Sequence, residues 1–245
     1  MPITGGYLAR RFRRGVATKL AEYISVIQEE MLPVFSDLNE KSDRIADEEF
    51  YRLCSLQEPD NFDDDQSSIA EAAREKSATY YNTMDVFRRA SLTLYTVGLF
   101  HYLEQLLTDI CRDNSFGAKA PTETKLSNVV TWYEKNFGFD LKSFELWSDI
   151  DELRLFANTA KHGDGSSAKK LRTLRPSLFE DASIRDLLPD HPDIYTSFHL
   201  HLPIAGQDLF VTTEIFSEYG AKAFEFIIEI AKYFEGKADE LYFND

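Results

Sequence analysis

One stretch decides the fold class of this chain, residues 67–112: SSIAEAAREKSATYYNTMDVFRRASLTLYTVGLFHYLEQLLTDICR. Its apolar side chains recur every one, three or four residues, which is the spacing of a buried stripe along a helix. The members of the stripe, with the small Ser91 among them, are Met84, Phe87, Ser91, Leu92, Tyr95, Leu99, Tyr102, Leu106 and Ile110. The pattern predicts one long helix over this whole range.

The segments on either side are mostly helical in pattern as well. Residues 7–40 are expected to form one or two helices, with a kink or break at Pro33, and further helices are expected at 41–56, 124–136, 141–162 and 213–235. A short helix that Ser166 or Ser167 can cap should run to Leu174. Residues 194–212 alternate apolar and polar side chains around a turn at 203–206, which indicates a small C-terminal β-hairpin. We therefore expect a mainly α-helical bundle that forms a single domain over residues 1–245, with a central region at 67–175.

The composition narrows the classes of function. The 245 residues carry a formal net charge of −15, so nucleic acid could bind only at a local positive patch or within an assembly. Cys54 and Cys111 lack metal-ligand spacing and are expected to be reduced. Because no apolar run reaches about 18 residues and no signal-peptide core follows the N-terminus, we expect no membrane partner and a cytoplasmic location.

Four arginines, Arg10, Arg11, Arg13 and Arg14, precede the first acidic residue, Glu22. A basic run of this kind is compatible with an arm that binds nucleic acid or a partner. The plainer interpretation is a solvated helical turn in an acidic protein, because four arginines are a weak electrostatic footprint.

Polar groups converge in the segment ELRLFANTAKHG, residues 152–163. Arg154, Asn158 and His162 recur every fourth residue, so they share one face of the expected helix. Gly163 follows at the position where a glycine commonly ends a helix. The sequence thus gathers a guanidinium, an amide and an imidazole near one helix end.

Apolar residues flank this polar stripe on both sides. Phe144, Trp147 and Leu155 fall within or beside the same arc of the helix. The core stripe on the adjacent arc consists of Leu146, Ile150, Leu153, Ala157 and Ala160. Because a solvated helix face would not be flanked in this way, the pattern indicates a half-buried polar site or a surface covered by another subunit.

The three polar side chains have the parts of a metal-free phosphodiester cleavage site. An imidazole in the last helical turn can exchange protons with a sugar hydroxyl or a leaving oxygen. Arginine can hold a phosphate in fork geometry. The structural alternative is that His162 caps the helix end, Asn158 ties a loop and Arg154 pairs with a nearby acid. The residue types leave both interpretations open.

This stretch resembles the signature of the HEPN superfamily, all-helical domains of many prokaryotic RNases, toxins and antiviral effectors. The resemblance rests on Asn158 followed by His162, on the run KHGDGS at residues 161–166, and on Glu104 in the long preceding helix. Arg154 stands one helical turn before the position of the family's arginine. The resemblance implies a HEPN-like bundle with metal-independent endoribonuclease activity in a prokaryotic antiviral defence or toxin system. It implies no cofactor, and a homodimer in which two copies of the site helix meet.

In that function His162 is the general acid/base, Arg154 holds the scissile phosphate of an RNA substrate, and Asn158 orients either group. Lys161 is assigned to substrate binding. A second function comes from a different class of protein: a catalytically inactive HEPN-like module that scaffolds a multi-protein defence complex. The acidic net charge and the early position of Arg154 favour this alternative.

Two histidine pairs were weighed as metal ligands. His199 and His201 share a face of the expected hairpin, with Asp208 across from them, and His101 lies one helical turn before Glu104. Neither pair has a convincing further ligand, so an exposed hairpin face and a helix surface are the plainer interpretations. The sequence also lacks P-loop, dinucleotide-binding, nucleophile-elbow and zinc-protease motifs. No metal site and no cofactor are therefore predicted.

Overall fold

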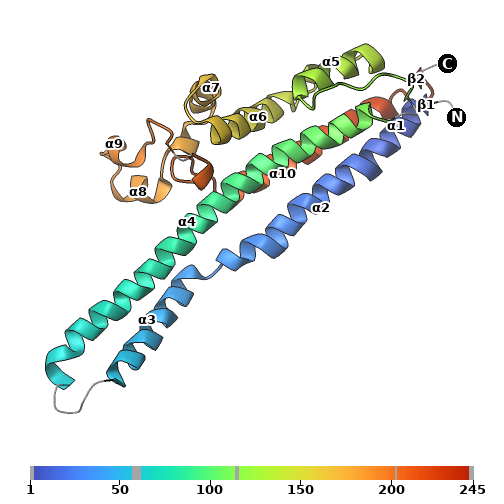
Figure 1. The fold of residues 1–245 in the computed structure, drawn as a ribbon. Coiled ribbons are helices and arrows are strands. Elements are labelled where there is room, and N and C mark those ends of the chain that lie inside the picture. The colour runs from blue at the N-terminus through green and yellow to red at the C-terminus, as the bar shows by residue number, and fades with distance from the viewer. Residues whose placement is uncertain (1–2, 57–61, 114–115, 202, 243–245) are drawn as a thin grey trace.

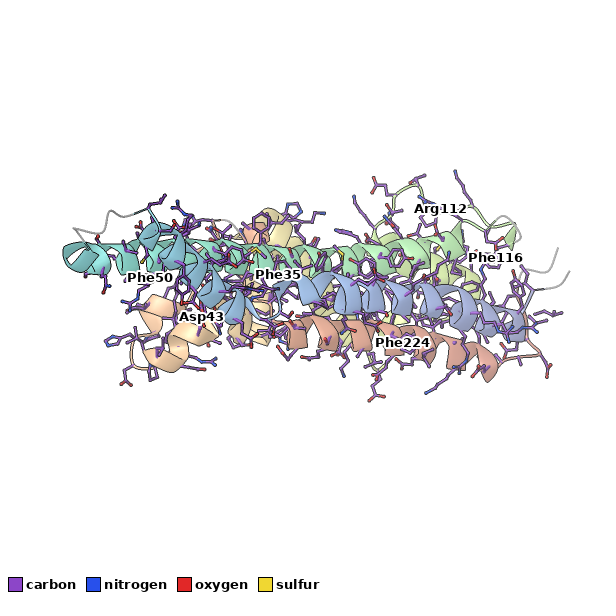
Figure 2. The ribbon with its side chains drawn as sticks, turned by 90° about the horizontal axis from the view of Figure 1, so that it is seen from below. Phe35, Asp43, Phe50, Arg112, Phe116 and Phe224 are labelled. Carbon is purple, nitrogen blue, oxygen red and sulfur yellow. The ribbon has the colours of Figure 1, made fainter. Side chains whose placement is uncertain are left out.

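The computed structural model describes residues 3–56, 62–113, 116–201 and 203–242, and nearly all of it is helical (Figure 1). The predicted mainly α-helical class is therefore confirmed. Long helices run side by side along the molecule, and the N-terminal helices pack against both α4 and α10 (Figures 1 and 2). Within these residues, no helix combines the length and the apolar character needed to cross a membrane.

The chain begins with a continuous helical rod. Its parts are α1 (Gly5–Arg11), Phe12–Ala17, α2 (Thr18–Val26) and Ile27–Met31. Pro33 lies in the tight turn that follows, Leu32–Phe35, where it cannot donate the next helical hydrogen bond. The labelled Phe35 marks the end of the rod in Figure 2. The predicted break at Pro33 is thus confirmed.

Two antiparallel helices form an arm that projects from the rest of the molecule (Figure 1). They are α3 (Leu38–Cys54) and the first half of α4 (Phe62–Cys111). With 50 residues, α4 is about 75 Å long at the usual helical rise. The predicted long helix over 67–112 is confirmed and begins a few residues earlier than expected.

The interior of the arm contains polar side chains as well as apolar ones. The hydroxyls of Ser42 and Ser77 lie 2.7 Å apart, and each is within 3.1 Å of the other residue's backbone carbonyl. Nearer the tip, Arg52 and Lys76 each donate to the Glu49 carboxylate at 2.6 Å. These hydrogen bonds, of which that from Arg52 has the largest effect, hold the pKa of Glu49 at about 2. Directed polar contacts therefore fix how α3 pairs with α4.

The body of the protein has an aromatic core. Its remaining long helices are α5 (Leu126–Phe137), α6 (Trp147–His162) and α10 (Thr213–Glu235). The ring of Phe234 lies 5.3–5.6 Å from the rings of Phe12, Phe137 and Phe139, centroid to centroid. All four side chains are buried, so the rod, α10 and the α5 region pack around one centre. The predicted helix at 213–235 is confirmed.

The two ends of the described chain meet. β1 (Ile3–Thr4) pairs antiparallel with β2 (Leu241–Tyr242), with Ile3 opposite Tyr242. A few residues further on, Arg13 donates to both carboxylate oxygens of Glu235 at 2.5 and 2.9 Å, and Arg11 pairs with Asp113. Two of the four N-terminal arginines are thus engaged within the chain, which supports the plainer interpretation of that basic run.

The hairpin predicted at residues 194–212 does not form among the described residues; Leu202 lies outside them. The chain between α7 (Ser166–Leu174) and α10 instead forms two short helices, α8 (Ala182–Leu187) and α9 (Pro192–Tyr195), and a single helical turn at Pro203–Ala205. The amides of Leu200 and His201 donate to the carboxylates of Asp164 and Asp208 at 3.2 and 2.6 Å. Because side chains take these donors, no partner strand is needed, and the small strand pair of the fold is β1–β2.

Gly206 lies where this irregular segment crosses α4. Its φ of 72° is the left-handed conformation, and a Cβ there would lie 2.5 Å from the carbonyl carbon of Arg89. Both the backbone angle and the close approach require glycine.

Candidate functional site

A cleft of about 640 Å³ opens between α4, α5 and α6. Three elements supply its walls: Phe100, His101 and Glu104 from α4, a stretch of α5 with the loop before it, and Trp147, Asp151, Arg154, Asn158 and Lys161 from α6. Arg154, Asn158 and Lys161 were predicted as site residues from the sequence, and the structure brings these three together.

The α6 wall is a straight row of side chains. Its members follow one another by four, three, four and three residues, from Trp147 to Lys161. Seven residues are nearly two full turns, so Lys161 lies within about 20° of Arg154 around the helix. The next arc of α6, which includes Leu153 and Ala157, is buried in the core. This alternating spacing is the sequence signal that identifies the face of α6 lining the cleft.

His162 does not line the cleft. Its side chain is exposed at the end of α6, where the Gly163 amide closes the helix by donating to the Thr159 carbonyl at 2.9 Å. Each step of four residues turns the helix face by about 40°, so His162 is rotated about 80° from Arg154. The predicted polar stripe therefore curves away from the site, and in this chain His162 is separated from Arg154.

The imidazole in the cleft belongs to His101. Its Nε2 lies 3.3 Å from Nζ of Lys161, and its Nδ1 lies 3.3 Å from Oε2 of Glu104. Lysine ammonium has no lone pair, so Nε2 accepts and Nδ1 carries the proton that is donated to Glu104. A carboxylate therefore orients a histidine whose other nitrogen is a proton acceptor, which is the arrangement that a general base needs.

Glu104 also holds the cleft together. Its other oxygen, Oε1, accepts from the backbone amide of Leu126 at 2.7 Å. Leu126 is the first residue of α5, and Lys125 before it provides no side-chain cap. The carboxylate therefore occupies the favourable end of the α5 dipole and fixes α5 against α4. The Glu104 side chain is only 13% exposed.

Arg154 lies on the opposite wall with most of its donors unused. Its Nε donates to Oδ1 of Asp151 at 2.8 Å. The guanidinium makes no other hydrogen bond to a described residue, and the side chain is partly exposed. Both Nη groups are thus available to a ligand in the cleft, in the fork geometry that suits phosphate or carboxylate.

The cleft is less acidic than the rest of the protein. Lys125, Lys142, Arg154 and Lys161 line it together with three acids, Glu104, Glu134 and Asp151. This local balance contrasts with the chain's formal net charge of −15. Counted by formal charge, the lining is close to neutral at +1, so an anionic ligand meets less repulsion here than from the protein as a whole.

The apolar flanks of the α6 stripe are covered by the chain itself. Leu155 is 2% exposed, and Trp147 and Phe144 pack against Phe226 of α10 with ring centroids about 6 Å apart. The sequence suggested that a second copy covers this surface, but α10 and the core do so. The flanks therefore give no support to a homodimer, which stays a prediction.

The other candidate groups do not assemble into sites. Asp208 reaches the backbone amide of His201 rather than its imidazole, and His199 lies 3.6 Å from Asp164. Among the described residues, no three His, Cys, Asp or Glu side chains are arranged to hold a metal ion. Cys111 is buried, and burial raises the pKa of its thiol to about 12.

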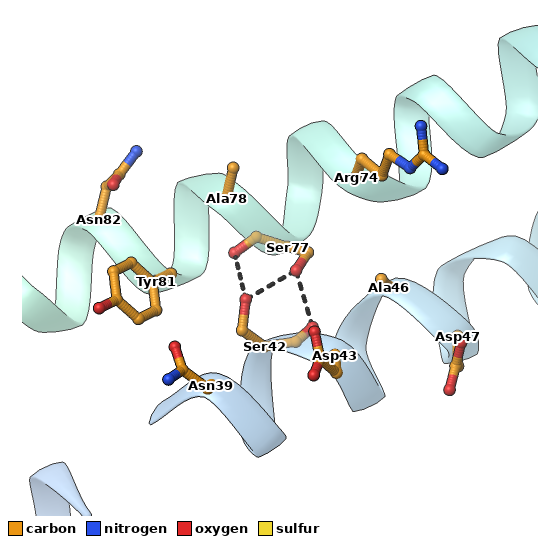
Figure 3. A pocket seen from close by; sticks show the side chains of 10 residues that line it. All are labelled: Asn39, Ser42, Asp43, Ala46, Asp47, Arg74, Ser77, Ala78, Tyr81 and Asn82. Carbon is orange, nitrogen blue, oxygen red and sulfur yellow. Dashed lines mark hydrogen bonds between the residues drawn. The ribbon is translucent and has the colours of Figure 1, made fainter. Parts of the chain in front are cut away.

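A second hollow, of about 560 Å³, lies on the arm between α3 and α4 (Figure 3). The hydrogen-bonded pair Ser42 and Ser77 joins the helices there, and Asp43, Asp47 and Arg74 are among its other residues. None of its lining residues is a histidine or a cysteine. It therefore lacks a group that transfers protons near neutral pH.

Comparison with family models, with curated proteins and with solved structures finds no match to this chain. The HEPN resemblance therefore rests on the sequence features quoted above, and the chemistry of the cleft has to be argued from its own geometry.

Proposed function

We propose that this protein is a metal-independent endoribonuclease whose phosphodiester site is the cleft between α4, α5 and α6. The observation that supports this proposal most is the placement of His101 between Glu104 and Lys161, opposite the guanidinium of Arg154. An oriented imidazole and cationic donors in one cleft are the groups that metal-free RNA cleavage uses.

The chemistry follows from the roles of these side chains. An incoming phosphate draws Lys161 away from His101 and leaves the Nε2 lone pair unoccupied. Nε2 then takes the proton of a ribose 2′-hydroxyl, and the 2′-oxygen attacks phosphorus. The bond from phosphorus to the 5′-oxygen breaks, and the Lys161 ammonium supplies a proton to that oxygen. The products are a 2′,3′-cyclic phosphate and a free 5′-hydroxyl.

Arg154 and Asn158 act on the same phosphate. The two Nη groups of Arg154 bind its non-bridging oxygens and stabilise the charge that develops there. Asn158, between Arg154 and Lys161 in the α6 row, orients the substrate through its amide. In this proposal His101, rather than His162, is the general base. The exposed His162 takes part only if a second copy brings it to a cleft.

The test compares two histidine variants on an unstructured RNA oligonucleotide. His101→Ala should lower the cleavage rate by about 10²–10⁴, the usual effect of losing one acid–base group. His162→Ala is the matched control and should cleave at the wild-type rate. Its products should end in a 2′,3′-cyclic phosphate, and a chelator should not stop the reaction. Equal activity of wild type and His101→Ala, both folded, would remove the proposed chemistry. Loss of activity only in His162→Ala would move it to a dimer interface, which light scattering would detect.

The biological setting is proposed from the HEPN resemblance: a prokaryotic antiviral defence or toxin system in the cytoplasm. In that setting the wild-type chain should arrest growth when it is expressed in bacteria, and the His101→Ala chain should not. Growth arrest by both variants would contradict the link between the cleft and toxicity.

One observation favours the alternative function, an inactive scaffold of a multi-protein complex. On α4, close to the arm, Phe87 is 61% exposed and Leu94 is 50% exposed. These side chains lie seven residues apart, so they share one helix face. If the protein is a scaffold, Phe87→Asp should prevent complex assembly, whereas His101→Ala should have no effect.

A further inference from the structure

A second basic segment of the chain, after the N-terminal arginines, begins in α6. Residues 154–179 contain six lysines or arginines and one acid, a formal net charge of +5 in a protein with a net charge of −15. The cations are Arg154, Lys161, Lys169, Lys170, Arg172 and Arg175. Charge of this density, set in an acidic protein, attracts a polyanion to one place.

Two of these cations face solvent on α7. Lys169 and Lys170 are exposed and form no ion pair with any described residue. Arg175, by contrast, pairs with Glu152 and Glu218 and serves to join α6, α7 and α10. The side chains of Lys169 and Lys170 are therefore the available charges of this helix.

An aromatic ring is held in solvent on a loop that is bonded to the same helix, α7. Arg172 donates to the backbone carbonyls of Ser197 and Phe198 at 2.9 and 3.2 Å, and its guanidinium stacks on the ring of Phe179 at 4.4 Å. The loop is thereby fixed to α7, yet the Phe198 side chain is 54% exposed. A rigid backbone that keeps a large apolar ring in water is suited to stacking on a flat ligand group.

The surface formed by α7 and the loop with Phe198 adjoins the cleft. A Cβ on Gly163, directly after α6, would lie 3.3 Å from the Leu200 carbonyl oxygen, so the loop with Phe198 touches the end of α6. The neighbouring Asp164 carboxylate accepts from the Leu200 amide. Lys161, two residues before Gly163, contacts His101 inside the cleft. A strand leaving the cleft past Lys161 therefore arrives at Phe198 and α7.

We propose that Lys169, Lys170 and Phe198, here called the α7 strip, bind single-stranded RNA that extends from the cleft. The proposal rests on the proposed endoribonuclease function. The two lysines contact successive phosphates, and an unpaired base stacks on Phe198, a combination that recurs in single-strand binding. A membrane surface fits less well, because α7 presents cations without the row of large apolar side chains that an interfacial helix needs.

The test measures binding of a fluorescein-labelled single-stranded RNA of about 16 nucleotides by anisotropy, using the full chain. The His101→Ala background prevents cleavage during the measurement. Lys169→Glu with Lys170→Glu should weaken binding at least about tenfold near 0.1 M salt. It should also reduce the slope of log K against log salt by about 1.4. The control, Lys19→Glu with Lys232→Glu, makes the same charge change at exposed positions on α2 and α10 and should bind normally.

Stacking is tested at Phe198. Phe198→Ala should lower the affinity by about fivefold or more, and Phe198→Tyr, which keeps the ring, should restore it. Each variant is first shown to unfold at the temperature of its parent.

The outcomes separate this inference from the proposed function. If the wild type cleaves RNA but the α7 lysine variant and its control bind equally, the inference is overturned and the endoribonuclease stands. If RNA is not cleaved but binding depends on the α7 lysines and Phe198, the inference stands without the enzyme. Lysine-dependent binding to phosphatidylserine–phosphatidylcholine vesicles, with no binding to RNA, also overturns it.

Discussion

Removing the Glu104 carboxylate should destabilise the protein in a way that removing His101 does not. Glu104→Ala eliminates the acceptor of the Leu126 amide, a bond of 2.7 Å to a side chain that is 13% exposed. A hydrogen bond to a charged group contributes about 1.5–3 kcal/mol, and loss of a helix N-terminal cap costs about 1 kcal/mol. These figures describe the same contact and are not added, so we expect Glu104→Ala to lower the free energy of unfolding by about 1–3 kcal/mol.

The measurement is urea unfolding followed by circular dichroism, with thermal unfolding as a second probe. For a chain of this size a loss of that magnitude lowers the midpoint temperature by about 2–12 °C. Glu104→Gln keeps an acceptor oxygen and should lose about 1 kcal/mol or less. Gln105→Ala, at the exposed neighbouring position, is the matched control and should change little. His101→Ala leaves the cap in place and should also unfold like the wild type.

The result that would refute this reasoning is equal stability of Glu104→Ala and Gln105→Ala. The carboxylate would then not hold the start of α5, and the orientation of His101 by Glu104 would lose its structural basis. Destabilisation by His101→Ala as large as that by Glu104→Ala would likewise assign the histidine to stability rather than to chemistry.

Three further predictions concern the rest of the fold. Gly206→Ala should lower the free energy of unfolding, measured with urea, by at least about 2 kcal/mol, and by more than Gly138→Ala does. Both glycines have positive φ, but of the two only position 206 lacks space for a Cβ. Equal losses in the two variants would contradict the close approach of residue 206 to α4. Hydrogen bonds, of which that from Arg52 has the largest effect, hold the pKa of Glu49 at about 2, below its ordinary 4.5. The ionised Glu49 carboxylate therefore stabilises the fold fully above pH 4.5, and this stabilisation disappears as the pH falls toward 2. Glu49→Gln should make the stability less dependent on pH between 4.5 and 2, and an unchanged acid-unfolding profile would count against the network. Burial raises the pKa of Tyr23 from 10.0 to about 12, so the stability of the fold should decline as the pH rises through that interval. Tyr23→Phe should reduce this decline when the unfolding midpoint is measured at increasing alkaline pH. If the variant declines as steeply as the wild type, other groups cause the loss of stability.

Much of the candidate site could not be anticipated from the sequence. Arg154 and Asn158 were identified because their spacing along α6 is a local property of the helix, and Lys161 was assigned to substrate binding as the neighbour of His162. His101 was noticed only as half of an incomplete metal pair, because its contact with Lys161 joins residues 60 positions apart. Spacing alone also suggested His162, since a step of four residues looks like a straight row until the remaining rotation accumulates.

The sequence by itself determined the helices of this protein. The extent of α4, the break at Pro33 and the limits of α10 follow from side chains a few residues apart, and the structure confirms all three. Leu92, Leu99, Leu106 and Ile110 of the predicted α4 stripe are buried, but Phe87, near its start, is 61% exposed and that part of the prediction is wrong. Tertiary structure decided what each helix face meets. It placed α10 over the apolar flanks of α6, and it bonded the amides of Leu200 and His201 to carboxylates instead of a strand. Helical periodicity is local, whereas burial and the pairing of polar groups depend on segments that only the folded chain brings together.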